Sequence, residues 1–274
     1  MGHRFSLVHL TNIACPPPAF IRAAAKAGYD AVSLRTIPLG LPGERPYNLA
    51  KDPQLLRETK QALAETGIAY TDTEIARIAD GVDVRDHEPA LAAAAEMGVK
   101  HITSNIWIAD KARYTEQFAV LCELAEQYGQ DVNVEFVTWS SVPDLKQTKE
   151  LLQACGKQNV GILVDMLHFY RSRVALSELD ECPKEWFHYA HLCDCTAEIP
   201  TDVEELARTG RAERLCPGEG CVPIRDILSR IPNPDILCGL EVPNQVRLEQ
   251  LGFEEYARRV LQAAKKCLGE AEMA

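Results

Sequence analysis

Several features that are missing from this 274-residue sequence exclude whole classes of protein. Basic residues are few: 29 Lys and Arg stand against 40 Asp and Glu, and the net charge of -11 argues against binding to phosphate backbones. The chain has neither an apolar run of membrane length nor the apolar segment of a secretory signal. We therefore expect no nucleic-acid partner, no membrane partner and a cytoplasmic location.

The paired Cys-x-x-Cys spacing of zinc knuckles is also missing, although the chain has ten cysteines. The cysteines are scattered among apolar helix and strand positions, which predicts reduced and mostly buried thiols. A zinc clasp remains the alternative for one group, Cys193, Cys195, Cys216 and Cys221. Alternation along a strand explains the first two of these equally well, as neighbours on the same face.

Segments typical of strands and helices alternate along the whole chain without a linker. The predicted strands are residues 5–10, 30–35, 68–74, 101–106, 132–136, 159–165, 189–193 and 236–242. The predicted helices are residues 16–27, 52–67, 82–97, 112–128, 142–155, 174–186, 222–230 and 248–268, several of them ended by glycine. A long loop is expected at 196–220.

This alternation predicts parallel strands with crossover helices, and eight such units suggest a closed α/β barrel of the (β/α)8 TIM type. Barrels of this length commonly form one domain, so we expect residues 1–274 to be a single TIM-barrel domain. An open doubly wound sheet is the alternative. Its glycine-rich fingerprint is absent after the first strand, where residues 11–16 read Thr-Asn-Ile-Ala-Cys-Pro.

In a barrel, side chains at the carboxyl ends of the strands converge on one mouth. The polar residues predicted there are Arg35, Glu74, Asn105 with Trp107, Glu135, Asp165 with His168, His191 with Asp194, and Glu241. Carboxylates that interrupt apolar strands carry a heavy desolvation cost unless a positive charge lies beside them. Each of these polar residues could instead be paired with an arginine or with the backbone. Four of them at the ends of four consecutive strands favour one shared divalent cation. Its ligands would be Glu135, Asp165, His191 and Glu241, a set that suits Mn²⁺ or Mg²⁺ and also admits Co²⁺ or Zn²⁺.

Several short motifs carry a resemblance to a known family. They are Val-Glu-Phe at 134–136, Leu-Val-Asp-Met-Leu-His at 163–168, His-Tyr-Ala-His-Leu-Cys-Asp at 188–194, Pro-Gly-Glu-Gly at 217–220 and Gly-Leu-Glu at 239–241. Together they resemble the xylose isomerase-like TIM-barrel superfamily, and within it the sugar isomerase/epimerase group. The specific motifs lie from Glu135 onward, whereas the first half of the chain matches mainly in architecture.

The resemblance implies that Glu135 and Glu241 both bind the metal and exchange a proton with a small polyhydroxylated carbonyl substrate, a keto-sugar or keto-polyol, through an enediolate. It implies that His168 contacts a substrate oxygen, and that the protein is a homodimer or homotetramer. Dehydratases of inososes or dehydroshikimate share this constellation and remain the alternative. Further candidate substrate contacts at the mouth are Arg35, Glu74, Trp107, Trp139 and Asp194.

The sequence departs from part of the family pattern. Epimerases often have a substrate-binding arginine shortly after the His-x-x-Asp segment, but here Asp194 is followed by Cys-Thr-Ala-Glu, which argues against a standard ketohexose 3-epimerase. The acidic run 202–205 makes this loop unsuited to a phosphorylated sugar. The DNA-repair endonuclease branch would need extra metal histidines, and neither His87 nor His101 is placed to serve. A non-catalytic binding module is disfavoured by the intact ligand quartet. Residues 38–46 and 196–220 are candidate lids or interface loops.

Overall fold

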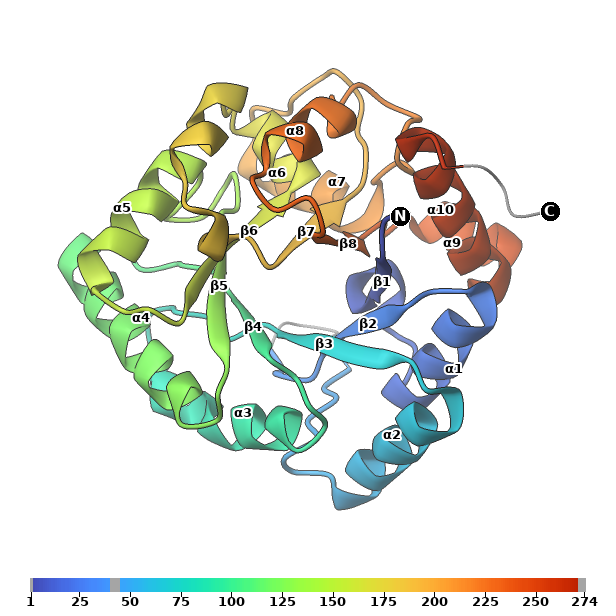
Figure 1. Cartoon of the computed structure of the whole chain (residues 1–274), viewed down its shortest axis with the longest axis horizontal. Helices are drawn as coiled ribbons and strands as arrows, with labels where there is room; N and C mark the ends of the chain where they lie inside the picture. Colours follow the sequence, from blue (N-terminus) through green and yellow to red (C-terminus); the bar gives the residue numbers. More distant parts are fainter. Residues whose placement is uncertain (1, 40–44, 271–274) are drawn as a thin grey trace.

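Eight parallel strands, neighbours in sequence order, close into a barrel that is surrounded by helices (Figure 1). The structure is a computed structural model that describes residues 2–39 and 45–270. The strands are β1 Phe5–Val8, β2 Ala31–Arg35, β3 Ala69–Glu74, β4 His101–Ser104, β5 Asp131–Glu135, β6 Val160–Asp165, β7 Tyr189–Leu192 and β8 Leu237–Leu240. Because β8 pairs with β1, the sheet has no open edge, and the predicted TIM-barrel fold is confirmed.

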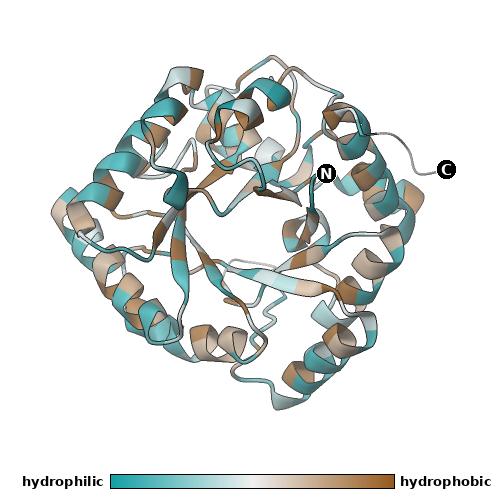
Figure 2. Cartoon of the chain, viewed as in Figure 1, coloured by the Kyte–Doolittle hydropathy of each residue, from teal (hydrophilic) through white to brown (hydrophobic). Residues whose placement is uncertain are grey.

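The helices of the outer ring begin and end largely where local sequence signals place them. They are α1 Pro17–Ala27, α2 Pro53–Thr66, α3 Glu88–Ala95, α4 Lys111–Glu126, α5 Leu145–Cys155, α6 Met166–Arg171, α7 Val203–Ala212, α8 Ile224–Arg230, α9 Gln245–Leu251 and α10 Phe253–Leu268. Several have an aspartate N-cap, and Asp144, for example, accepts a hydrogen bond from the backbone N–H of Gln147. Hydrophilic and hydrophobic residues are interspersed along these helices, as expected for helices with one face against a barrel (Figure 2).

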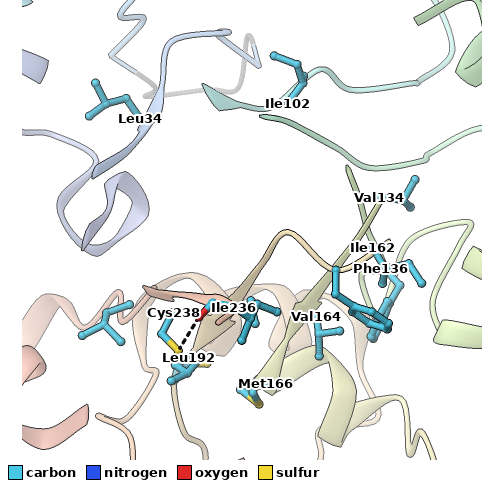
Figure 3. Close-up of a cluster of buried hydrophobic side chains, with 14 of the residues drawn as sticks. Leu34, Ile102, Val134, Phe136, Ile162, Val164, Met166, Leu192, Ile236 and Cys238 are labelled. Carbon is cyan, nitrogen blue, oxygen red and sulfur yellow. Dashed lines mark hydrogen bonds between the residues drawn. The ribbon is translucent and has the colours of Figure 1, made fainter. Parts of the chain in front are cut away.

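The hydrophobic core lies between the barrel and the helices. Alternate strand residues such as Val134, Ile162, Val164 and Leu192 belong to one buried cluster (Figure 3). Successive side chains on a strand point to opposite faces, so the residues between them face the barrel interior. This alternation directs the last residue of β5, the last residue of β6 and the third residue of β7 inward.

The structure corrects three of the predicted elements. Residues 196–220 are not simply a loop, because α7 lies within them. The region 174–186 contains two short 3₁₀ helices, η3 Leu176–Glu181 and η4 Lys184–Trp186, and the first helix after β6 is instead α6. The closing helix is divided at Gly252, whose φ of 74° is left-handed and separates α9 from α10.

Two further expectations concern cysteines and membranes. All ten cysteines are free thiols, and six of them are buried, which confirms the predicted reduced state. No three cysteines converge on a common point within residues 2–39 and 45–270, so the zinc clasp is not formed. In the same residues no helix is long and apolar enough to cross a membrane. Residues 40–44 of the predicted lid at 38–46 lie outside the described chain.

Candidate active site

The four predicted metal ligands lie together at the carboxyl end of the barrel. One ligand atom from each of Glu135, Asp165, His191 and Glu241 lies within 4.8 Å of the others, and all four side chains are buried. Glu135 ends β5, Asp165 ends β6, His191 lies in β7, and Glu241 directly follows β8. The four ligands thus come from four neighbouring parallel strands, β5 to β8, as the strand pattern predicts.

Glycine in β8 provides the space that His191 occupies. Gly239 pairs in register with His191, and a Cβ at Gly239 would lie 2.8 Å from His191 Cδ2 and 3.0 Å from Val8 Cγ2. A side chain there would push the imidazole away from the carboxylates. Gly239, two positions before Glu241, is therefore part of how the sequence forms the site.

Arg214 also lies in this cluster, and the sequence argument did not include it. Its Nη1 lies 2.5 Å from Asp165 Oδ2 and 2.9 Å from Glu241 Oε2, and the side chain is 3% exposed. Its Nε donates a hydrogen bond to the carbonyl of Gly210 at 2.7 Å. The guanidinium therefore supplies part of the positive charge that the sequence argument assigned to a metal ion alone.

The charges in this cluster shift the ionisation of its members in different directions. Burial, together with the charges of Glu241 and Asp165, raises the pKa of Glu135 to about 8. Burial also acts on Glu241, but Arg214 and His191 outweigh it and hold the pKa of Glu241 well below its usual range. Burial disfavours the charged imidazole of His191, but Glu241 and other carboxylates outweigh it and raise the pKa of His191 to about 10.

The donor atoms fit a divalent metal ion. Both ring nitrogens of His191 are buried and form no hydrogen bond with any described residue. Glu241 Oε2 is buried as well, and its close partner is the guanidinium of Arg214. Buried polar atoms without a partner are costly, and a cation between them would remove that cost. His191 Nδ1 lies 3.6 Å from Glu241 Oε2, which is too far for a hydrogen bond between the two side chains. Three carboxylates and one imidazole form the oxygen-rich set expected from the sequence.

A pocket opens onto this cluster at the barrel mouth. It encloses about 570 Å³, a volume that includes open solvent at its mouth. Glu135, Glu241, His168 and Arg214 line it together with other residues from several strands and loops, among them Arg35, Arg77, Asn105, Trp107, Trp139 and Arg211. Both glutamates of the quartet therefore face the space where a substrate would bind.

His168 lies in the first turn of α6 at the wall of the pocket. The backbone N–H of Thr138 donates to its Nδ1 at 3.3 Å, and the edge of Trp139 packs against its ring at a centroid distance of 5.0 Å. Burial, opposed by Asp165 and reinforced by Arg214, lowers the pKa of His168 to about 4. The imidazole is therefore neutral at pH 7, and because Nδ1 accepts, Nε2 carries the proton that can be donated.

Three of the further predicted substrate contacts, Arg35, Trp107 and Trp139, line the pocket, and Glu74 does not. Arg35 lines the pocket, and its Nη2 lies 3.2 Å from Glu74 Oε2. Trp107 also lines it, with its indole N–H donating to Asn105 Oδ1 at 2.7 Å. Glu74 is 1% exposed and lies 4.0 Å from His191 Nε2, so it is placed to hold Arg35 and His191.

Asp194 lies apart from the pocket lining and organises the loop that follows β7. Its carboxylate accepts hydrogen bonds from the backbone N–H groups of Cys195, Gly218, Gly220 and Val222, at 2.9 to 3.0 Å. The side chain is 1% exposed. Asp194, predicted as a substrate contact, is therefore not among the residues that line the pocket, and its oxygens accept hydrogen bonds from the backbone of residues 195–222.

A comparison with protein families identifies the chain. The model of the xylose isomerase-like TIM barrel family matches residues 21–267. The chain belongs to this family. Among curated proteins, an inosose isomerase of Halalkalibacterium halodurans is 27% identical to this chain over 111 residues, which are 40% of this chain and 37% of that protein. An inosose isomerase of Bacillus velezensis is 21% identical over 217 residues, which are 75% of each chain.

Solved structures of the xylose isomerase-like TIM barrel type share the fold. A crystal structure of the IOLI protein with a binding zinc atom is 16% identical, has a TM-score of 0.81, and covers 98% of this chain and 100% of that one. A probable 3-DHS dehydratase, AsbF, involved in petrobactin synthesis in Bacillus anthracis, is 17% identical with a TM-score of 0.75, over 94% and 98% of the two chains. Identities this low establish the barrel fold alone.

The sequence argument did not predict that arginines from the segment after β7 line the pocket. Arg211 and Arg214 line the pocket, although the acidic run before them made this segment look unsuited to an anionic group. Three arginines within seven residues, at 208, 211 and 214, were the available signal. A helix that begins in the acidic run and ends just before Arg214 brings the last two to the mouth of the barrel.

Proposed function

We propose that the protein is a divalent-metal-dependent isomerase or epimerase of a small keto-sugar or keto-polyol. It would act through an enediolate, with Glu135 and Glu241 removing and returning the proton. The observation that carries this proposal is geometric. Two buried glutamates from β5 and the end of β8 belong to one four-residue cluster and line one pocket at the barrel mouth. The inosose isomerases among the relatives support the same class of substrate.

Glu135, Asp165, His191 and Glu241 would hold the metal ion. Mn²⁺ or Mg²⁺ suits the three carboxylates best, and Co²⁺ or Zn²⁺ is compatible with the imidazole. The ion would supply one thing when bound, a more acidic C–H bond next to the substrate carbonyl. The zinc bound in the IOLI structure, which shares this fold, supports a divalent ion in this chain.

The side chains of the pocket would carry the proton. One glutamate removes the proton from the carbon next to the carbonyl, and the electron pair of that C–H bond forms the enediolate double bond. The other glutamate then donates a proton to carbon. Return to the opposite face of the same carbon gives an epimer, whereas return to the neighbouring carbon converts ketose and aldose. His168, neutral and protonated at Nε2, would donate a hydrogen bond to the substrate oxygen.

A dehydratase is the second candidate, and the arginines of the pocket favour it. Arg35, Arg77, Arg211 and Arg214 all line the pocket. Arg35 and Arg214 are paired with acids, but Arg211 forms no ion pair with any residue in the described chain. A free guanidinium at the mouth suits a substrate that carries a carboxylate, such as a dehydroshikimate-like compound. In that reaction the enediolate would expel hydroxide instead of accepting a proton.

One screen separates the two candidates. Purified protein with Mn²⁺ or Mg²⁺ is offered keto-sugars, inososes and dehydroshikimate, and the products are separated and weighed by mass spectrometry. An isomeric product of unchanged mass supports the isomerase, and a product lighter by one water supports the dehydratase. Glu135→Gln and Glu241→Gln should each abolish turnover, whereas Glu116→Gln, on the exposed surface of α4, should not. Turnover by the Glu135→Gln/Glu241→Gln double variant would contradict both candidates.

A further inference from the structure

A second cluster of metal-binding residue types lies at the opposite, amino-terminal end of the barrel. His101 is the first residue of β4, Asp131 is the first residue of β5 and pairs with it in register, and His188 directly precedes β7. One ligand atom from each lies within 4.8 Å of the other two. The three side chains are 21 to 35% exposed, so an ion in solvent can reach them. None of the three lines the pocket at the barrel mouth.

Asn133 fixes the tautomer of His188. The Nδ2 group of Asn133 donates to the carbonyl of Asp131 at 3.4 Å, so its Oδ1 is the atom that faces His188. Oδ1 lies 2.6 Å from His188 Nδ1 and can only accept, which places the imidazole proton on Nδ1. The lone pair of the neutral ring is then on Nε2, the usual arrangement in a metal-binding histidine whose other nitrogen is held by an outer partner.

The lone pair of His188 faces another acceptor. Its Nε2 lies 3.8 Å from Asp131 Oδ2, and two acceptors that face each other gain nothing unless a cation lies between them. His101 Nδ1 lies 3.5 Å from the same oxygen, is buried, and forms no hydrogen bond with any described residue. Metal–nitrogen and metal–oxygen bonds of about 2.0–2.2 Å in a tetrahedral site put neighbouring ligand atoms roughly 3.3–3.5 Å apart. The two separations from Asp131 Oδ2, 3.5 and 3.8 Å, are within a few tenths of an ångström of that spacing.

A glycine makes this arrangement possible across the intervening strand. Gly161 of β6 lies between β5 and β7, and a Cβ there would lie 2.1 Å from Asn133 Oδ1 and 2.6 Å from His188 Nδ1. Any side chain at this position would break the bond that orients His188.

We propose that His101, Asp131 and His188 bind a zinc ion at the amino end of the barrel, with water in the fourth position. Two imidazoles and one carboxylate form a set that favours zinc, whereas the oxygen-rich set at the mouth favours Mn²⁺ or Mg²⁺. The ion would join β4, β5 and the entry of β7. Because the amino-terminal face of a TIM barrel is generally its stability face, the role of this site is structural. The proposal does not depend on the reaction at the mouth.

The test uses a variant in which the predicted metal site at the mouth is disabled. The Glu135→Gln/Glu241→Gln variant, freed of metal with a chelator, is titrated with Zn²⁺ by calorimetry, and we expect one ion per chain and a rise in Tm. Adding Asp131→Asn, which keeps the shape of the side chain, or His188→Gln should abolish both effects. Adding His3→Gln instead, at a histidine outside the cluster, should leave both unchanged. If the mouth-deficient variant binds no Zn²⁺, or if Asp131→Asn leaves its affinity intact, the proposal is overturned.

A second measurement does not depend on how well those variants fold. X-ray absorption at the zinc edge of the mouth-deficient variant should show two imidazole ligands together with oxygen ligands. Co²⁺ in place of Zn²⁺ should give hyperfine-shifted NMR signals from two histidine rings. A spectrum with one histidine or none would place the ion elsewhere and overturn the proposal.

Discussion

Arg214 ties two buried carboxylates of the candidate site to the segment after β7. Its guanidinium lies within 2.9 Å of both Asp165 and Glu241, and all three groups are at most 3% exposed. A buried ion pair that loses one partner leaves an uncompensated charge, which typically costs about 3–5 kcal/mol. A bound divalent ion would take over part of this compensation.

We therefore predict that Arg214→Met lowers the free energy of unfolding of the metal-free protein by about 3–5 kcal/mol, and by less when Mn²⁺ is present. Urea denaturation with a chelator or with Mn²⁺ measures both values. Arg230→Met, which breaks an exposed pair with Asp180, is the matched control and should cost about 1 kcal/mol or less. Equal losses for the two variants would show that Arg214 does not carry the compensating charge.

His168 lines the pocket but does not belong to the ligand quartet. We predict that His168→Gln lowers kcat by about 10²-fold, because a hydrogen-bond donor to the substrate oxygen is lost, while the Kd for Mn²⁺ changes little. Steady-state kinetics and Mn²⁺ titration of the same preparation give the two numbers. A large loss of Mn²⁺ affinity would instead make His168 a ligand.

At the scale of elements, the segment from β7 to α8 depends on one side chain. Asp194 accepts four backbone hydrogen bonds from residues 195–222, and this segment also carries Arg211 and Arg214 to the pocket. Replacing the carboxylate by an amide turns an acceptor oxygen into a donor that faces backbone N–H groups. The segment should then lose its fixed conformation before the barrel itself unfolds.

We predict that Asp194→Asn destabilises the protein by about 2–3 kcal/mol and makes residues 195–222 the first site of limited proteolysis. Denaturation and mass mapping of the cleavage products measure the two effects. Asp202→Asn, at the exposed N-cap of α7, is a control that should cost well under about 1 kcal/mol, because asparagine caps a helix about as well as aspartate. Unchanged stability combined with lost substrate binding would restore the interpretation of Asp194 as a substrate contact.

Elements with strong local signals could be predicted from the sequence, and those set by distant contacts could not. Glycines such as Gly28 and Gly67, with positive φ, end helices as expected. The division of the last helix at Gly252 was missed because the apolar period continues across it. The position of Arg214 was missed for a different reason: it is 49 residues from Asp165, and only the path of α7 brings the two together.

At the scale of the whole molecule, the order of strands around the barrel determines the site. Because the strands are parallel and the barrel is closed, the four residues of the quartet, which are 26 to 106 residues apart in sequence, come to one mouth. This is why the quartet could be predicted from strand ends alone. The same topology brings His101, Asp131 and His188 together at the other end. Of these three residues the sequence argument considered only His101, and set it aside because it lies at the amino end of a strand.

The central claim is that Glu135 and Glu241 exchange a proton with the carbon next to a substrate carbonyl. The most direct measurement is deuterium incorporation from D₂O, followed by mass spectrometry and NMR of recovered substrate and product, with Mn²⁺ present. We predict that the wild-type protein incorporates one deuterium at that carbon, and that Glu135→Gln, Glu241→Gln and removal of Mn²⁺ each prevent it. Turnover without solvent deuterium in the product, or label uptake that survives in the Glu135→Gln/Glu241→Gln variant, would contradict the account.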